Sequence, residues 1–166
     1  MNRKAHIIGG ALFWAIVIGF YYWFGELLTE YSIWIMLSFF SSQFGAQLPD
    51  YDILWKKALP HRNILTHSFI LPALLTIPIY FITTEMVFLL PIFALYLIGH
   101  ASHLFLDLFP KGWEGSALVH LWWRNEKGRK TMNGTASFMF LLTNGLIILA
   151  GGIIFLFFFA QWAALI

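Results

Sequence analysis

The chain is organised around the stretch Leu48–Ser68, which reads LPDYDILWKKALPHRNILTHS. This stretch holds two of the three Asp residues, two of the six His residues and three of the ten Lys and Arg residues. Long apolar segments flank it on both sides. Because only 11% of all residues are charged, the concentration of metal-ligand side chains in one short polar loop indicates a functional site.

Composition is that of an integral membrane protein. Hydrophobic residues make up 60% and aromatic residues 19% of the 166 residues, and the mean hydropathy is +0.74. These values lie outside the usual range for soluble domains. The length predicts one domain, a transmembrane domain over residues 1–166. The sequence contains no Cys, which excludes disulfides and Cys-based zinc sites.

Five apolar segments have lengths suited to a hydrocarbon core of about 30 Å. We interpret the first as a retained anchor, since no cleavage site of small residues follows it. The predicted fold is therefore all-α, an integral membrane helical bundle of about five transmembrane helices. The five segments are Ile7–Phe24, Tyr31–Gln47, Ile64–Thr83, Met86–Phe109 and Ala136–Ile166.

All ten basic residues fall on one side of this predicted bundle, while the opposite loops contain only Glu26, Glu30 and Glu85. The positive-inside rule then predicts a multi-pass protein of the inner (cytoplasmic) membrane with a cytoplasmic N-terminus. All six His and all three Asp residues gather on the same side, although His played no part in the orientation. We therefore expect a metal cluster at the cytoplasmic helix ends.

The end of the fourth segment carries His100, His103 and Asp107 at helical spacing, which puts them on one face of a helix. His103 and Asp107 are one turn apart, near enough to bind one ion or two neighbouring ions. A satisfied buried His–Asp pair, or a proton relay in a transporter bundle, is the alternative interpretation of the same pattern.

The central stretch adds two further pairs. Asp50 and Asp52 follow the second helix and are expected on non-helical backbone, where one carboxylate could bridge two ions; a turn with a capping Asp is the alternative. His61 and His67 are six residues apart, so both reach one centre only if the loop folds back. Arg62 between them fits a plain positive-inside charge as well as a functional role.

Four single residues need separate interpretation. His6 precedes the first segment on the cytoplasmic side, although a lone His near an N-terminus is usually an interface residue. His120 lies among Leu and Trp residues and fits an interfacial loop anchor. Thr66 and Ser68 have the pattern of residues that cap or back-bond a helix.

The candidates provide imidazole and carboxylate groups without a thiolate. This set suits zinc, manganese or iron, and does not suit copper(I) or an iron–sulfur cluster. One zinc ion takes three or four protein ligands, so the larger set predicts two or three ions, in the first place zinc. The candidate ligands are His6, Asp50, Asp52, His61, His67, His103 and Asp107.

The motifs resemble those of a known family. His6, LPDYD at 48–52, HRNILTHS at 61–68 and GHASHLFLDLFPKG at 99–112 are similar in order and spacing to the motifs of the membrane-bound metal-dependent hydrolases of the bacterial inner membrane, which include the LexA-regulated inner-membrane hydrolase. The resemblance implies that the seven candidates are metal ligands. A distant likeness to the zinc-dependent phospholipase C and single-strand nuclease superfamily implies an all-helical fold around a zinc cluster. Asn63 departs from the family pattern, in which Gly is common.

The resemblance implies a hydrolase, and we expect a phosphoesterase that cleaves a lipid-borne phosphate ester at the cytoplasmic membrane face. The expected catalytic residues are Asp50, Arg62 and Asp107. Asp50 would take a proton, and Arg62 would neutralise phosphate charge together with Lys111 or Arg124. The expected partners are the lipid bilayer and a phosphate-containing lipid. Nucleic acid is not expected, since topology accounts for the basic residues.

Two other functions remain open. A transporter that conducts protons or metal ions would use the same residue types, but its ionisable residues would be spread through the membrane depth. A non-catalytic membrane subunit could use a structural metal to hold its helix ends together. The concentration of ionisable residues at one face weighs against the transporter.

Overall fold

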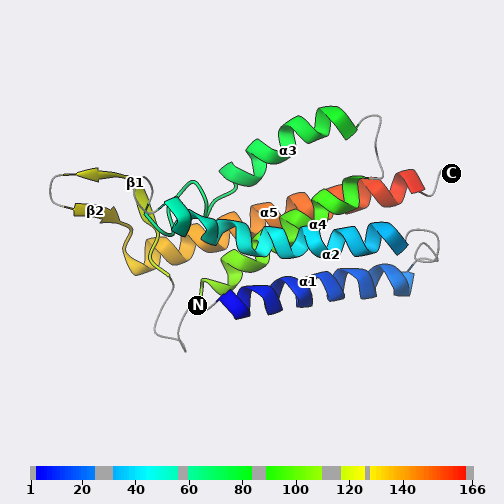
Figure 1. The fold of residues 1–166 in the computed structure, drawn as a ribbon, viewed down its shortest axis with the longest axis horizontal. Coiled ribbons are helices and arrows are strands. Elements are labelled where there is room, and N and C mark those ends of the chain that lie inside the picture. Colours follow the sequence, from blue (N-terminus) through cyan, green and yellow to red (C-terminus); the bar gives the residue numbers. More distant parts are fainter. Residues whose placement is uncertain are drawn as a thin grey trace.

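A computed structural model describes residues 3–24, 32–55, 60–83, 89–109, 117–125 and 128–163. The helices run alternately in opposite directions, so the two termini lie at opposite ends of the molecule (Figure 1). The elements, in chain order, are α1 (Arg3–Phe24), α2 (Ser32–Gln47), the 3₁₀ helix η1 (Leu48–Trp55), α3 (Ile70–Thr83), α4 (Leu90–Leu106), β1 (His120–Asn125), β2 (Gly128–Thr131) and α5 (Gly134–Ala163).

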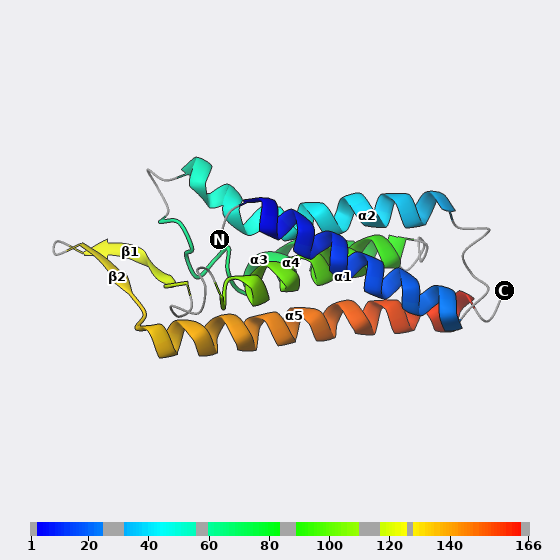
Figure 2. The ribbon, with the colours of Figure 1, turned by 90° about the horizontal axis from the view of Figure 1, so that it is seen from below.

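Helix α4 forms the core of the bundle. Every residue from Ala94 to Leu104 is buried, and α1, α2 and α5 pack around this helix (Figures 1 and 2). Its residues Leu97 and Leu104 share one apolar cluster with Leu141 of α5. Helix α3 diverges from the bundle along its length (Figure 1). A helix that is apolar all round, as α4 is, belongs in a bundle core.

Small residues let α2 and α4 approach closely. A Cβ atom at Gly45 would overlap the carbonyl oxygen of Tyr96, and a Cβ atom at Gly99 would overlap the carbonyl oxygen of Ser42. Helices in membranes associate through such small residues because lipid provides no hydrophobic force between them. The close approach presses the end of α2 against the last turns of α4.

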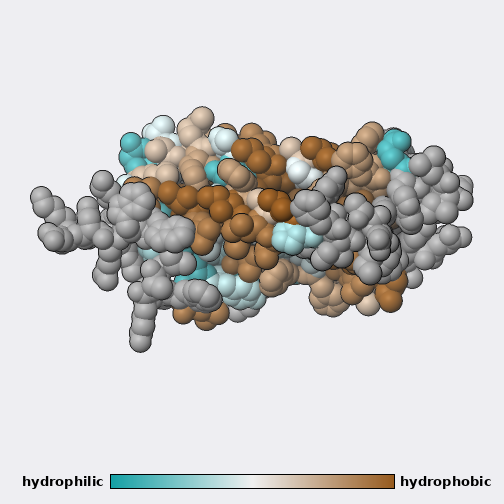
Figure 3. Space-filling view, turned by 90° about the horizontal axis from the view of Figure 1, so that it is seen from above, coloured by the Kyte–Doolittle hydropathy of each residue, from teal (hydrophilic) through white to brown (hydrophobic). Residues whose placement is uncertain are grey.

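The face of the bundle that Figure 3 shows is largely apolar between its two ends. On α1 an exposed stripe at helical spacing consists of Ile8, Leu12, Ile16 and Phe20. Helix α5 exposes further large side chains, among them Phe157 and Phe158 near its end. Contiguous apolar surface of this extent is matched by lipid rather than by water.

By length and composition alone, α5 is the one helix of the described residues that could cross a membrane, over Gly134–Gln161 with a mean hydropathy of 2.3. Shorter apolar stretches are Lys4–Phe20 and Leu90–Leu106. The all-helical bundle is thus confirmed, whereas five transmembrane crossings and the predicted orientation stay predictions.

The helices follow the predicted apolar segments, with local differences. Helix α1 begins at Arg3, so His6 lies on a helix rather than before it. The third helix begins only at Ile70, because the residues before it form turns. The expectation of non-helical backbone at Asp50 and Asp52 is wrong. Both belong to η1, which follows α2 directly, and a 3₁₀ turn is a common ending for an α-helix.

The hairpin of β1 and β2 is an element that the all-α prediction omits. Its sequence, HLWWRNEKGRKT, has the charge of a loop and lies between two apolar segments. The strands pair antiparallel, and a register irregularity lies between the first two of their paired positions. These positions are His120 with Thr131, Arg124 with Arg129, and Asn125 with Gly128.

Candidate metal centre

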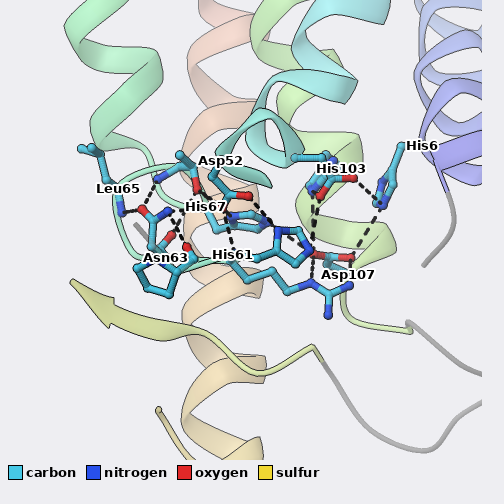
Figure 4. A network of polar contacts seen from close by, with 12 residues as sticks. His6, Asp52, His61, Asn63, Leu65, His67, His103 and Asp107 are labelled. Atoms are coloured by element: carbon cyan, nitrogen blue, oxygen red, sulfur yellow. Dashed lines mark hydrogen bonds and ion pairs between the residues drawn. The ribbon is translucent and has the colours of Figure 1, made fainter. Parts of the chain in front are cut away.

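The seven candidate ligands meet at one end of the bundle (Figure 4). The alternating helix directions bring the start of α1 and the ends of α2 and α4 to this end, and the loop at residues 60–69 joins them there. The structure therefore brings all seven residues together, and what they bind stays a prediction. They are His6 on α1, Asp50 and Asp52 on η1, His61 and His67 in the loop, His103 on α4, and Asp107 at the C-cap of α4.

Two groups of three side chains present ligand atoms that lie within 4.8 Å of one another. One group is His6, Asp50 and His103, and the other is His67, His103 and Asp107. Nε2 of His103 lies 3.8 Å from Oδ1 of Asp50 and 3.7 Å from Oδ2 of Asp107. Nε2 of His6 lies 3.8 Å from an oxygen of each carboxylate. His103 thus stands at the middle of the centre.

These distances match the distance between two neighbouring ligand atoms that bind the same metal ion. Hydrogen bonds from N–H to O span about 2.7–3.2 Å, whereas two ligand atoms about 2.1 Å from one tetrahedral ion lie about 3.4 Å apart. The separations from His67 Nε2 and His103 Nε2 to Asp107 Oδ2 are 3.5 and 3.7 Å. Within the described part of the chain, Nε2 of His6, His67 and His103 is buried without a hydrogen-bond partner. Such atoms are costly unless something binds them.

Two imidazoles use their Nδ1 atoms for hydrogen bonds to residues that are in neither ligand group. Nδ1 of His103 lies 2.8 Å from the carbonyl oxygen of Ala46. A carbonyl oxygen only accepts, so the proton belongs to Nδ1 and the lone pair to Nε2. Nδ1 of His61 likewise lies 2.7 Å from Oδ1 of Asp52. The close packing of α2 on α4 therefore fixes the tautomer of His103.

His67 follows the same rule through a hydroxyl group. Its Nδ1 atom lies 2.9 Å from Oγ1 of Thr66, and that hydroxyl donates to Oδ2 of Asp52 at 2.9 Å. Because the hydroxyl has a single hydrogen, it accepts the hydrogen on Nδ1 of His67. The lone pair of His67 Nε2 then faces the carboxylate of Asp107. An outer hydrogen bond on one ring nitrogen and an inward lone pair on the other are typical of His that ligates a metal.

The charge of the centre also favours a cation. With neutral imidazoles, the three carboxylates of Asp50, Asp52 and Asp107 and the guanidinium of Arg62 leave a net charge of −2. The rings of His6 and His103 stack with 3.9 Å between their centroids and 16° between their planes. Two protonated rings would repel each other at this distance. Neutral imidazoles beside carboxylates are the donor set that a divalent metal requires.

Asp52 differs from the other two carboxylates because hydrogen bonds saturate it. Burial alone would raise the pKa of Asp52, but the hydrogen bond from His61 and the electrostatic influence of the nearby His67 lower it, and the net pKa lies below its ordinary value. Asp52 belongs to neither group of ligand atoms. Its geometry is that of a residue that orients His61 and the loop. Its donors are Nδ1 of His61 at 2.7 Å, the backbone N of Arg62 at 2.8 Å, Oγ1 of Thr66 at 2.9 Å and Nδ2 of Asn63 at 3.2 Å.

Asn63 organises the loop. Its Oδ1 atom accepts hydrogen bonds from the backbone N–H groups of Leu65 at 3.0 Å and Thr66 at 3.1 Å, which makes a turn of the Asx type. Its Nδ2 atom donates to the carbonyl oxygen of Pro60 at 3.0 Å as well as to Asp52. Asn63 also forms an isolated parallel bridge with His120. The departure from the family pattern at this position therefore has a structural role.

Arg62 connects two carboxylates. Its φ angle of 58° is in the left-handed region, which few side-chain-bearing residues adopt. Its backbone N–H points to Asp52, while its side chain makes a forked contact with Asp107, Nε to Oδ2 at 3.1 Å and Nη2 to Oδ1 at 3.4 Å. Two of its five N–H donors are thus engaged, and the side chain is 22% exposed. The remaining donors suit an anion.

The other residues that the sequence singled out either belong to neither ligand group or lie outside the described residues. His100 is fully buried one turn before His103, with its ring 6.2 Å from that of Tyr96, and belongs to neither ligand group. The main chain of His120 pairs with the loop. Lys111 lies outside the described residues, as does the side chain of Arg124.

Sequence reasoning missed three supports of the centre. Asn63 and Thr66 carried a signal, since they are short polar residues between two His residues in an otherwise apolar chain. Ala46 carried none, because it contributes only a carbonyl oxygen.

The fold and the centre define a helical membrane protein with a His and Asp centre at its helix ends. The chain matches the family described as YdjM inner membrane protein over residues 1–165, and it belongs to that family. It is therefore an inner membrane protein, as predicted. The match supports neither the predicted hydrolase activity nor the likeness to phospholipase C. No curated protein and no solved structure matches the chain.

Proposed function

We propose that this protein is a metal-dependent hydrolase that cleaves a lipid-borne phosphate ester at the cytoplasmic face of the inner membrane. The observation that carries the proposal is the convergence of imidazole lone pairs and carboxylates. Nε2 of His6, His67 and His103 is buried without a hydrogen-bond partner in the described residues. Each lies 3.5–3.8 Å from a carboxylate oxygen. Bound divalent cations would account for these contacts.

The described residues offer ligands for more than one ion. The two ligand groups share Nε2 of His103, and one ring nitrogen binds one ion, so they cannot both use it. A second ion would need further donors, and Nε2 of His61, which is 3.9 Å from Oδ1 of Asp50, is the nearest candidate. Two or three zinc ions are proposed because the seven candidate ligands exceed the three or four protein ligands that one zinc ion takes, with manganese or iron as the alternatives.

The exposure and contacts of Asp50, Asp107 and Arg62 suggest a different chemical role for each. A bound divalent ion would supply an acidified water and polarise the phosphoryl oxygen. Asp50 is 21% exposed and suits the removal of a proton, whereas both oxygens of Asp107 already contact Arg62. The remaining donors of Arg62 would hold a phosphate oxygen. Asp107 then positions Arg62 and a metal rather than taking a proton.

The surroundings of the centre favour a substrate that reaches it from the lipid. Tyr51, Ile53 and Leu54 are exposed on η1, next to the two carboxylates. Exposed apolar residues also run along α1 and α5 from this end. We propose that all five helices cross the membrane, with the centre at headgroup depth, where a phosphate group lies at the boundary of the apolar core.

Elemental analysis of the detergent-purified protein tests the metal centre first. We expect at least two zinc, manganese or iron ions per chain, and their loss in His103→Ala. The matched control is His100→Ala, which removes an equally buried imidazole one turn away that is in neither ligand group. A wild type that stays metal-free after reloading, or an equal loss in both variants, would count against the centre.

A hydrolysis assay tests the reaction. The metal-loaded protein is reconstituted in vesicles of phosphatidylethanolamine and phosphatidylglycerol, and released phosphate and phosphorylated headgroups are measured. We expect release that His103→Ala abolishes and that His100→Ala preserves. If metal binds but no phosphate ester is cleaved, the hydrolase proposal fails while the metal centre stands.

A structural metal is the second candidate function, because one ligand group is fully enclosed. The side chains of His67, His103 and Asp107 have no exposed area. A closed shell without bound water would tie α4 to the loop and need no substrate. Measurements of water exchange at the bound ion separate the two functions. A catalytic ion carries an exchangeable water molecule, and a closed structural ion does not.

A further inference from the structure

The hairpin of β1 and β2 projects beyond the helix ends on the side of the metal centre (Figures 1 and 2). Its twelve residues, 120–131, contain four of the ten basic residues of the chain and one acidic residue. The basic residues are Arg124, Lys127, Arg129 and Lys130, and the acidic residue is Glu126.

The register of the hairpin places two of these basic residues at directly paired backbone positions. Arg124 pairs directly with Arg129, beside the pair of Asn125 with Gly128 that adjoins the turn. Like charges at directly paired positions destabilise a sheet, and a two-stranded hairpin alone is only marginally stable. A bound anion removes this repulsion. The juxtaposition therefore points to an anionic ligand.

Backbone hydrogen bonds fix the base of the hairpin to the metal centre. The N–H of His120 donates to the carbonyl oxygen of Arg62 at 2.8 Å, and the N–H of Ile64 donates to the carbonyl oxygen of His120 at 3.1 Å. On the other strand, the N–H of Met132 donates to the carbonyl oxygen of Val119 at 2.9 Å. An anion held by the hairpin is thus tied to the loop that carries His61 and His67.

We propose that this hairpin binds the phosphate headgroups of anionic lipids. Clusters of four or more basic residues next to membrane helices are attracted to anionic lipid surfaces, and Trp122 and Trp123 in β1 are of the residue type that favours the interface. The hairpin leaves the bundle at the end where α1 begins (Figure 1). That the held lipid is also the substrate rests on the proposed function, whereas the binding itself does not.

Lipid counting by mass spectrometry of the intact, delipidated protein in detergent tests the proposal. Phosphatidylglycerol and phosphatidylcholine are titrated separately into the wild type and into the double variant Arg124→Gln/Arg129→Gln. The matched control, Arg3→Gln/Lys4→Gln, removes the same charge at the start of α1, at the same end of the bundle. We expect the wild type to prefer phosphatidylglycerol over phosphatidylcholine by at least about tenfold, since each basic residue near an anionic surface contributes roughly fivefold in affinity. The hairpin variant should lose most of this preference, and the control should keep it.

An unchanged preference in the hairpin variant, or an equal loss in the control, would overturn the proposal. A second variant, Lys127→Gln/Lys130→Gln, provides the test if the first fails to fold, and we expect a partial loss of preference. Metal content and turnover are not needed for this readout. His103→Ala should therefore bind phosphatidylglycerol like the wild type even if it has lost its metal, so failure of the hairpin and failure of the hydrolase give different results.

Discussion

Asp50 and Asp52 lie two residues apart on the same 3₁₀ helix and face the same centre, yet their surroundings differ completely. The side chain of Asp52 is wholly buried and accepts hydrogen bonds from four donors. Asp50 is 21% exposed, and its oxygens lie 3.8–3.9 Å from the Nε2 atoms of His6, His61 and His103. No hydrogen bond from another described residue reaches it. The carboxylate of Asp52 therefore stabilises the folded loop, whereas the carboxylate of Asp50 is available to bind an ion.

The largest expected effect is on stability, in Asp52→Ala. The substitution leaves several buried donors without an acceptor, at roughly 1–3 kcal/mol each. We expect the free energy of unfolding in mild detergent, measured without metal, to fall by about 3 kcal/mol or more. Asp50→Ala should change it by less than about 1 kcal/mol, since no hydrogen bond from the described residues is lost. Equal losses would remove the distinction between the two carboxylates.

The next effect is on metal affinity, in Asp50→Ala. This variant removes a ligand that the stacked pair of His6 and His103 shares. We expect metal affinity to fall by at least about 100-fold, beyond the 10–100-fold typical of residues that only orient a ligand. Competition with a fluorescent chelator measures it. A smaller loss in Asp50→Ala than in Asp52→Ala would mean that Asp52 is the ligand and Asp50 the support.

The comparison of Asp50 with Asp52 also shows how much of the structure could be predicted from the sequence. The helix positions and the location of His and Asp at one end could be predicted because they follow from hydropathy, charge asymmetry and helical spacing. These three properties are visible in the sequence itself. The sequence could not distinguish the role of Asp50 from that of Asp52, since both are carboxylates in the same short motif. Their difference arises from the folded loop, where Arg62 adopts a left-handed φ and turns its N–H toward Asp52.

Tertiary contacts limited the prediction in two further places. The tautomer of His103 depends on the carbonyl oxygen of Ala46, which comes within reach only because Gly45 and Gly99 let two helices touch. The hairpin after the fourth helix was missed because its charged residues favour a loop, whereas pairing with the site loop through His120 stabilises it. Neither contact has a local signal in the sequence.

A smaller effect is expected in Asn63→Ala. The variant loses the Asx turn and one of the four donors to Asp52, so the free energy of unfolding should fall by about 1–3 kcal/mol. Asn133→Ala is the matched control. Its Oδ1 accepts a hydrogen bond from the backbone N–H of Ala136 at 2.7 Å at the exposed start of α5, away from the centre. Metal affinity should fall in Asn63→Ala and remain unchanged in Asn133→Ala, as followed by chelator competition.

The smallest effect is expected in Thr66→Val, which keeps the shape of the side chain and removes only its hydroxyl. Because that hydroxyl donates to Asp52 and accepts from His67 Nδ1, its loss should cost about 1 kcal/mol of stability and about tenfold in metal affinity. Thr76→Val is the control, since its hydroxyl bonds only within α3, to the carbonyl oxygens of Pro72 and Ala73. Isothermal titration with zinc measures the affinities. If both variants bind zinc like the wild type, Thr66 does not set the tautomer of His67, and the inward lone pair must have another cause.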